Sequence, residues 1–155
     1  MRVYRLSSKA HRATAFNGEG ARLAGGRWNH KGQRVVYCSE SRALAAMELF
    51  VNLDPSLAPP ELVFIAVDVP DDMISVVKLA DLPSNWNEYP APDDVKDIGT
   101  EWIVKKTSAA LVVPSVVMPE EKNLLLNPEH TDFGRIKIGK PIKFTFDGRM
   151  WKGTP

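Results

Sequence analysis

Apolar residues fall mainly into short runs of strand length. The longest of these, LVFIAVDV at residues 62–69, is typical of a strand that lies centrally in a sheet. Shorter runs predict further strands at residues 2–6, 35–38, 110–113, 115–118, 124–126, 135–138 and 142–146. Turns are expected between the later runs, at residues 119–122, 127–130 and 139–141.

Two segments carry helical patterns. Ser39 or Ser41 can cap a helix of about 12 residues that is apolar on nearly every side, which predicts a buried helix ended by Pro55. A second helix is expected from Asp93 to Lys106, because acidic residues at its start and lysines at its end complement the helix dipole. Its inward-facing stripe comprises Val95, Ile98 and Trp102.

Two other stretches lack a regular pattern. Residues 15–33 are rich in glycine and predict an irregular excursion, and residues 70–92 are expected to form loops. Helices that are few and strands that follow one another closely favour the α+β class. We therefore expect a single domain over residues 1–155, with a mostly antiparallel sheet and a few helices.

Composition limits the kinds of partner that the protein can bind and the compartment in which it is expected to work. The 155 residues carry a net charge of +1, which argues against nucleic acid as a direct ligand. Cys38 is the only cysteine, so no disulfide forms within the chain, and a reducing compartment is favoured. The N-terminus has no signal-peptide core, and no run approaches the roughly 18 apolar residues of a membrane span. We expect a soluble, cytoplasmic protein.

Glu48 is the most informative single residue. At 100° per residue it shares one arc of the first helix with Leu44, Met47 and Val51. An unpaired carboxylate among packed apolar groups is costly. Glu48 therefore either reaches water or an arginine at the margin of the core, or lines a cleft.

The basic and aromatic candidates lie nearer the N-terminus. Arg27 follows Gly25 and Gly26, which allow a sharp turn or a close approach of the backbone. It is either a loop charge or a fork for a phosphate or carboxylate. Arg5, in the first predicted strand, is a second basic candidate. Tyr37 is either a core tyrosine with a satisfied hydroxyl or faces the side of the glycine-rich loop.

The later candidates are weaker when taken singly. Ser115 interrupts an apolar run, so its hydroxyl needs a partner, either backbone or ligand. Asn127 and His130 lie in the segment NPEH, for which a plain turn is the favoured interpretation. The histidines and Cys38 do not show metal-ligand spacing. The glycine-rich segment runs into WNHKG instead of opening a helix, which argues against a Rossmann dinucleotide loop.

Five short stretches nevertheless occur in a distinctive order: GGRWN, VVYCS, AAMEL, VPSVV and NPEH. This ordered set resembles the RES-domain family, the toxin half of bacterial RES–Xre toxin–antitoxin modules, over nearly the whole chain. The resemblance implies a fold similar to ADP-ribosyltransferases of the diphtheria-toxin type. It also implies NAD+ as substrate, no metal, and an Xre-family helix-turn-helix antitoxin as partner. The site residues that it implies are Arg27, Tyr37, Glu48 and Ser115, with Arg5 and Asn127 as further contributors.

The residue types suit cleavage of the nicotinamide–ribose bond of NAD+, which would deplete the cell of NAD+ and arrest growth. Glu48 would stabilise the positive charge that develops on the ribose. Arg27 would hold a phosphate, Tyr37 would stack on the nicotinamide or ribose, and Ser115 would bond the nicotinamide amide or a phosphate oxygen.

The sequence leaves the acceptor of ADP-ribose open. Water would make the protein a glycohydrolase, inorganic phosphate a phosphorylase, and a protein side chain an ADP-ribosyltransferase. A different class is a non-catalytic module whose groove binds a partner peptide through exposed groups such as Trp28 and Trp86. The catalytic hypothesis depends on Arg27 and Glu48 sharing one cavity.

Overall fold

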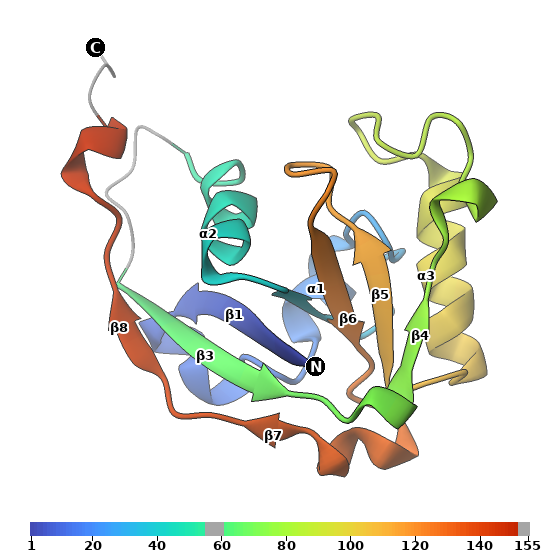
Figure 1. Cartoon of the computed structure of the whole chain (residues 1–155), viewed down its shortest axis with the longest axis horizontal. Coiled ribbons are helices and arrows are strands. Elements are labelled where there is room, and N and C mark those ends of the chain that lie inside the picture. Colours follow the sequence, from blue (N-terminus) through green and yellow to red (C-terminus); the bar gives the residue numbers. More distant parts are fainter. Residues whose placement is uncertain (55–60, 152–155) are drawn as a thin grey trace.

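A computed structural model of the chain describes residues 1–54 and 61–151. The strands build one curled sheet in the order β4-β5-β6-β2-β1-β3-β7, with β8 also paired to β3 (Figure 1). Its strands are β1 Arg2–Ser8, β2 Val36–Ser39, β3 Leu62–Asp68, β4 Ile74–Val76, β5 Ala110–Pro114, β6 Lys122–Leu126, β7 Lys137–Ile138 and β8 Ile142–Phe144. The α-helices are α1 Glu19–Ala24, α2 Arg42–Phe50 and α3 Asp93–Lys105.

The pairing of the strands confirms the predicted α+β class. Every pair is antiparallel except β4 with β5, which is parallel. The apolar run of β3 lies between β1 on one side and β7 and β8 on the other, as expected for a strand inside a sheet.

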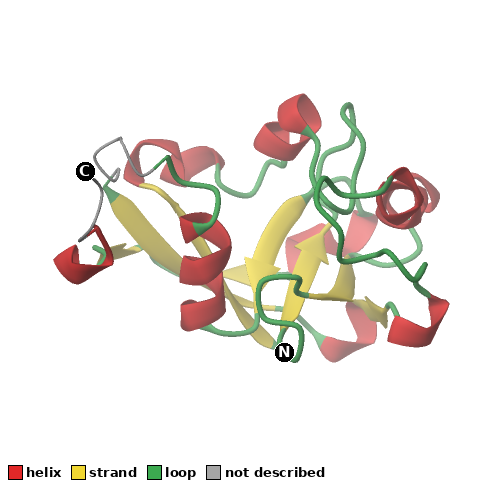
Figure 2. Ribbon diagram, turned by 90° about the horizontal axis from the view of Figure 1, so that it is seen from above, coloured by secondary structure: helices red, strands yellow, loops and turns green. Residues whose placement is uncertain are grey.

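The sheet is weakly paired between β1 and β2, and the cavity described below opens beside this seam. β1 and β3 are paired along seven positions, whereas the β1–β2 ladder has the single pair Tyr4↔Ser39. The half of the sheet made of β4, β5, β6 and β2 therefore diverges from the half that contains β1 and β3. Helices α2 and α3 flank the β5–β6 pair on opposite sides (Figures 1 and 2; Figure 2 is seen from above).

Side chains that alternate along the central strands build two cores on opposite faces. On one face Val36 and Cys38 of β2 pack with Leu124 and Leu126 of β6. On the other face Leu125 packs with residues of α3 and the glycine-rich segment. This second core comprises Trp28, Val35, Val95, Trp102, Ile103, Leu111, Val113 and Leu125. Because successive side chains of a strand point to opposite faces, alternate residues of β5 and β6 meet α3.

Helix α2 begins as predicted but is less buried than predicted. The Ser41 hydroxyl accepts a hydrogen bond from the Leu44 N–H at 3.0 Å, which caps the helix. The helix ends at Phe50, and Pro55 lies outside the described residues. Within it only Leu44 and Ala45 are buried, so the expectation of a buried helix was wrong. The partly buried Ala46 and Leu49 pack with Ala45 against a core cluster that contains Leu6 and Phe64 of the sheet. Glu48 is the residue of α2 that lies on the wall of the cavity described below.

Helix α3 agrees with the prediction, since Val95 and Trp102 are buried and Ile98 is partly buried against the same core. Three other segments differ. The stretch 15–33 contains α1, and the expected loop 70–92 contains β4, whose three residues are too short to show a period. Residues 115–118 form no strand, because the chain turns back and the Ser115 N–H donates to the Glu121 carbonyl at 3.0 Å.

Candidate active site

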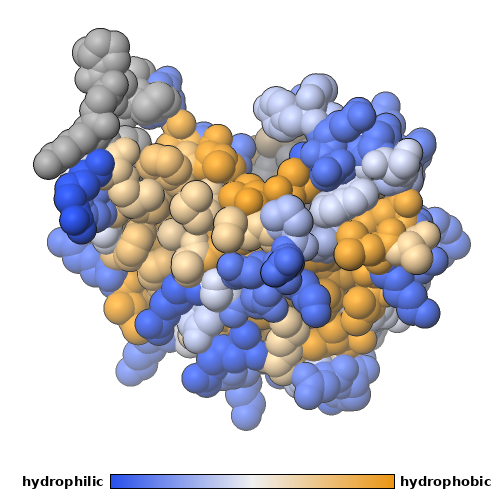
Figure 3. All heavy atoms as spheres, turned by 45° about the horizontal axis from the view of Figure 1, so that its top comes forward, coloured by the Kyte–Doolittle hydropathy of each residue, from blue (hydrophilic) through white to orange (hydrophobic). Residues whose placement is uncertain are grey.

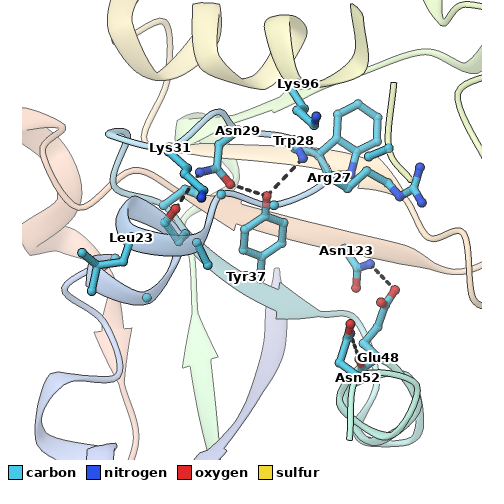
Figure 4. A pocket seen from close by; sticks show the side chains of 18 of the residues that line it. Leu23, Arg27, Trp28, Asn29, Lys31, Tyr37, Glu48, Asn52, Lys96 and Asn123 are labelled. Carbon is cyan, nitrogen blue, oxygen red and sulfur yellow. Dashed lines mark hydrogen bonds between the residues drawn. The ribbon is translucent and has the colours of Figure 1, made fainter. Parts of the chain in front are cut away.

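A cavity of about 1480 Å³ opens beside the seam between β1 and β2. Arg5, Arg27, Tyr37, Glu48 and Asn123 lie on its wall. In Figure 3 the surface is hollowed between a mostly hydrophobic region and a mostly hydrophilic one. Figure 4 shows Glu48 entering from α2 and Arg27 from the loop that follows α1. The arginine and the glutamate therefore share one cavity.

Glu48 is held by polar groups from the sheet rather than from its own helix. Its Oε1 accepts hydrogen bonds from the Ser115 hydroxyl at 2.7 Å and from the Asn123 side-chain amide at 2.6 Å. The Ser115 oxygen in turn accepts the Met118 N–H at 3.0 Å. Among the residues that the structure describes, Oε2 takes part in no hydrogen bond. One oxygen is thus fixed while the other stays available.

Tyr37 holds the glycine-rich loop in place. Its hydroxyl donates to Asn29 Oδ1 at 2.7 Å and accepts the Trp28 N–H at 3.1 Å. Asn29 is fully buried, and its amide also donates to the Ala21 carbonyl at 3.0 Å. Burial raises the pKa of the Tyr37 hydroxyl, so the hydroxyl remains a proton donor. A ligand in the cavity would therefore meet the ring of Tyr37 and not a free hydroxyl.

Gly26 explains why a small residue precedes Arg27. A Cβ at Gly26 would lie 2.5 Å from Tyr37 Oη and 2.9 Å from Asn29 Oδ1, closer than real contacts allow. Gly25 has a φ of +74°, a conformation that side chains rarely adopt. The first glycine thus makes the turn, and the second allows the tyrosine hydroxyl to approach the loop.

The Arg27 guanidinium uses one of its nitrogens inside the protein. Nη1 donates to the carbonyls of Trp86 and Glu88, at 2.9 Å each, and so tethers the loop before α3. Within the described part of the chain, Nε and Nη2 have no hydrogen-bond partner and no carboxylate forms an ion pair with Arg27. Burial lowers the pKa of Arg27, while the nearby charge of Glu48 opposes this shift. An arginine stays charged under such conditions.

The side chain of Arg5 reaches from β1 across the seam to β2. Its Nη1 donates to the Tyr37 carbonyl of β2 at 2.8 Å, where the two strands are no longer paired. Its Nε is buried without a hydrogen-bond partner. Burial lowers the pKa of Arg5, although the group remains a cation. Arg5 therefore presents a second unneutralised charge near the cavity.

Ser115 and Asn127 are placed differently from the sequence-based expectation. Ser115 is fully buried and is not on the cavity wall, because its hydroxyl is engaged between Glu48 and Met118. Ser115 therefore contacts Glu48 in this structure, and a role of Ser115 at the site stays a prediction.

Asn127 is also fully buried and lies beyond the end of β6, away from the cavity. Its amide donates to the Ile103 carbonyl at 3.2 Å, and its Oδ1 accepts the Glu129 N–H at 3.0 Å. In the same turn, His130 Nδ1 accepts the Asp132 N–H. The turn interpretation of the segment NPEH is confirmed, and Asn127 stabilises this turn rather than lining the cavity.

The structure argues against the alternative of a peptide-binding groove, because that alternative needs exposed tryptophans. Trp28 is only 2% exposed because α3 packs against it: a Cβ on Gly99 of α3 would lie 1.9 Å from the Trp28 carbonyl oxygen. Trp86 is also partly buried in the same core. Neither tryptophan is the exposed group that this alternative required.

The sequence did not single out three polar residues that build the site, namely Ser39, Asn123 and Asn29. Asn123 offered a signal, since an amide inside the apolar strand KNLLL needs a partner when it is buried. Its partners come from β2 and α2, which are distant in sequence. In the described residues no group of three or more His, Cys, Asp or Glu side chains could hold a metal ion, and no helix there is long and apolar enough to cross a membrane.

The curled α+β sheet is a fold that is also seen in a toxin–antitoxin complex. The chain matches a chain of the crystal structure of the M. tuberculosis MbcT–MbcA toxin–antitoxin complex with a TM-score of 0.74, over 97% of this chain and 86% of that one. Because the two are 19% identical, this match shows the fold alone.

The RES domain family matches residues 2–147, and the chain belongs to this family, as the ordered motifs predicted. It is 38% identical over 151 residues to Toxin Res of Yersinia enterocolitica, which covers 97% of this chain and 99% of the relative. It is also 38% identical over 146 residues to the Prs ADP-ribosylating toxin of Sphingobium sp. strain YBL2, which covers 92% of this chain and 91% of that protein.

Proposed function

We propose that this protein is the toxin of a toxin–antitoxin system and that it consumes NAD+ by cleaving the nicotinamide–ribose bond. One observation carries the proposal: Glu48 has one carboxylate oxygen held by two donors, while the other has no hydrogen-bond partner among the described residues, on the wall of a cavity that Arg27 also lines. The names of the RES-family relatives, which are toxins, support the same assignment.

The chemistry requires a fixed anion next to the ribose. When the bond breaks, its electron pair stays on the nicotinamide nitrogen, which becomes neutral, and positive charge develops on the ribose. The Glu48 carboxylate stabilises that charge without having to reorganise, because Oε1 is already held. An acceptor then bonds to the ribose carbon and releases its proton. With water as acceptor, the products are nicotinamide, ADP-ribose and a proton.

The other end of the dinucleotide is anionic. Arg27 has Nε and Nη2 free for a pair of parallel hydrogen bonds to phosphate oxygens. Arg5, with its unpartnered Nε, adds a second cation for the same group. The ring of Tyr37 lies on the wall of the same cavity and can stack on the nicotinamide or ribose. Ser115 acts through Glu48 and does not touch the dinucleotide.

A second candidate function is transfer of ADP-ribose to a specific protein. It is favoured by the relative named Prs ADP-ribosylating toxin, which is 38% identical to this chain. The same cavity serves both reactions, and only the acceptor differs.

The partner in this proposal is an Xre-family helix-turn-helix antitoxin that covers the cavity in the cytoplasm of a bacterium. The match to a chain of a toxin–antitoxin complex supports an antitoxin as partner. Contact with DNA is then left to the antitoxin, in line with the net charge of +1.

Glu48→Gln tests the reaction, with Glu101→Gln as the control, because Glu101 is an exposed residue of α3 that is not on the cavity wall. A glutamine at position 48 can still accept the bonds from Ser115 and Asn123, so the fold is retained and only the negative charge is lost. We expect Glu48→Gln to lower the rate of NAD+ loss about 10²- to 10³-fold. NAD+ loss at the wild-type rate in Glu48→Gln would contradict the role of Glu48.

The acceptor is identified by separating the products. Chromatography detects free ADP-ribose or its phosphate ester, whereas a lysate incubated with labelled NAD+ reveals a discrete labelled protein if the protein is a transferase. No NAD+ loss, no labelled protein and no growth arrest with the wild-type chain would exclude both functions.

A further inference from the structure

The donor that Asn123 gives to Glu48 is itself oriented by a buried hydroxyl. Ser39 and Asn123 are directly opposite each other in the β2–β6 ladder, so their side chains lie on the same face and close together. The Ser39 hydroxyl donates to Asn123 Oδ1 at 2.7 Å, and Asn123 Nδ2 donates to Glu48 Oε1 at 2.6 Å. A continuous chain of hydrogen bonds therefore runs from Ser39 to the carboxylate.

The donor-to-acceptor direction of these hydrogen bonds depends on how the Asn123 amide is oriented. An amide has a donor end and an acceptor end, and rotation by 180° exchanges them. The rotated amide would place its oxygen against Glu48 Oε1, so that two acceptors would face each other. The neighbour of Asn123 in the β5–β6 ladder is Val113, whose side chain has no donor. The Glu48 carboxylate, which can only accept, selects the donor end of the amide, and the Ser39 hydroxyl anchors the oxygen end so that the amide stays in this orientation.

We infer that Ser39 is a positioning residue for Glu48, acting through the orientation of the Asn123 amide. Ser39 is only 4% exposed and is not on the cavity wall, so it does not touch a ligand. The inference rests on the proposed function for its kinetic readout. It predicts an effect on the rate of the chemical step and not on the affinity for NAD+, because the residues that meet the dinucleotide are unchanged.

The first test compares Ser39→Ala with Ser39→Thr. The control is Ser108→Ala, which removes a hydroxyl that also has two hydrogen-bond partners but does not lie on the cavity wall. In folded protein, we expect Ser39→Ala to lower kcat for NAD+ loss about tenfold, with KM within about twofold of the wild type. Ser39→Thr keeps the hydroxyl and a side chain suited to a strand, so it retains kcat within about threefold.

An unchanged kcat in Ser39→Ala would overturn the inference. So would an equal loss of kcat in Ser39→Thr at an unchanged melting temperature, or an equal loss in Ser108→Ala. A raised KM in Ser39→Ala with kcat unchanged would also overturn it.

A double-mutant cycle separates a role through Asn123 from an independent one. If Ser39 acts only through Asn123, then Asn123→Ala and the Ser39→Ala/Asn123→Ala double variant have the same kcat within about twofold. If the two losses multiply, Ser39 does not act through Asn123.

A final measurement does not require activity and so remains decisive even if the proposed function fails. The side-chain amide resonance of Asn123 is identified by nuclear magnetic resonance from its absence in Asn123→Ala. In Ser39→Ala its protons should exchange with solvent at least about threefold faster than in the wild type, because the amide is no longer held at its oxygen. Unchanged exchange would refute the orientation by Ser39, whereas absence of NAD+ loss in the wild type would refute the proposed function alone.

Discussion

Replacing Gly26 by alanine should destabilise the protein through one contact. The added Cβ would lie 2.5 Å from Tyr37 Oη, whereas ordinary contacts begin at 3.4 Å. The hydroxyl must therefore move by roughly 1 Å, which is enough to break its hydrogen bonds to Asn29 and to the Trp28 N–H. The backbone of Gly26 does not have a positive φ, so the alanine causes no strain of its own.

The size of the effect follows from those two bonds. Each contributes about 1 kcal/mol to the free energy of unfolding, and a buried Asn29 oxygen left without a donor costs about 1–3 kcal/mol more. Alanine also restricts the unfolded chain, which offsets about 0.4–1 kcal/mol of this loss in the free energy of unfolding. We expect a net loss of about 3 kcal/mol, which corresponds to a fall in melting temperature of about 6–12 °C for a domain of this size.

Gly20→Ala is the matched control, because Gly20 lies in α1 and a Cβ there would have no atom within 4 Å. An alanine in a helix should stabilise the protein by about 0.5–1 kcal/mol. Urea unfolding of the two variants, followed by tryptophan fluorescence, gives both free energies. A Gly26→Ala variant as stable as Gly20→Ala would refute the view that the tyrosine hydroxyl requires glycine at this position.

Two further predictions concern buried groups. Ser115→Ala and Asn127→Ala should each lower the free energy of unfolding by about 2 kcal/mol, but only Ser115→Ala should lower kcat, by about tenfold and without a change in KM. Thermal melting and NAD+ kinetics check both variants, and a loss of kcat in Asn127→Ala would place that residue back at the site. Burial raises the pKa of the Cys38 thiol to about 12, so a thiol reagent at pH 8 should label it only after unfolding. Since the unfolded form loses its proton at lower pH, stability should also fall as the pH rises towards 12, which alkaline unfolding of Cys38→Ala measures by comparison.

Much of the fold followed from local patterns. The runs that became β3, β5 and α3 carry their period within a few residues, and Ser41 caps α2 through a group three residues away. The predictions were wrong where tertiary contacts determine the local structure. The apolar residues 115–118 turn back because of a bond to Glu121, and β4 exists only because β5 is beside it.

The candidate site also contains residues that the local sequence indicates and residues that only tertiary contacts reveal. Residue type and order indicated Arg27, Tyr37 and Glu48, and the structure places all three on the wall of one cavity, while their roles stay predictions. The role of Asn123 was missed because it depends on the register of β2 against β6, between residues 84 positions apart in the chain. Asn127 has the polarity expected of a site residue but lies off the cavity wall, at the opposite end of β6 from Asn123, which the local sequence does not indicate.

The origin of the groups that hold Glu48 explains how a short helix can present a fixed carboxylate. Helix α2 ends at Phe50, two residues after Glu48, so the helix alone provides little constraint on the side chain. The constraint comes from Ser115, directly after β5, and Asn123 within β6, and those strands are paired on both sides inside the sheet. Both donors meet the same oxygen, which leaves the second oxygen free to face a developing cation. A serine and an asparagine placed in otherwise apolar segments thus transmit the rigidity of the sheet to an acid on a half-exposed helix.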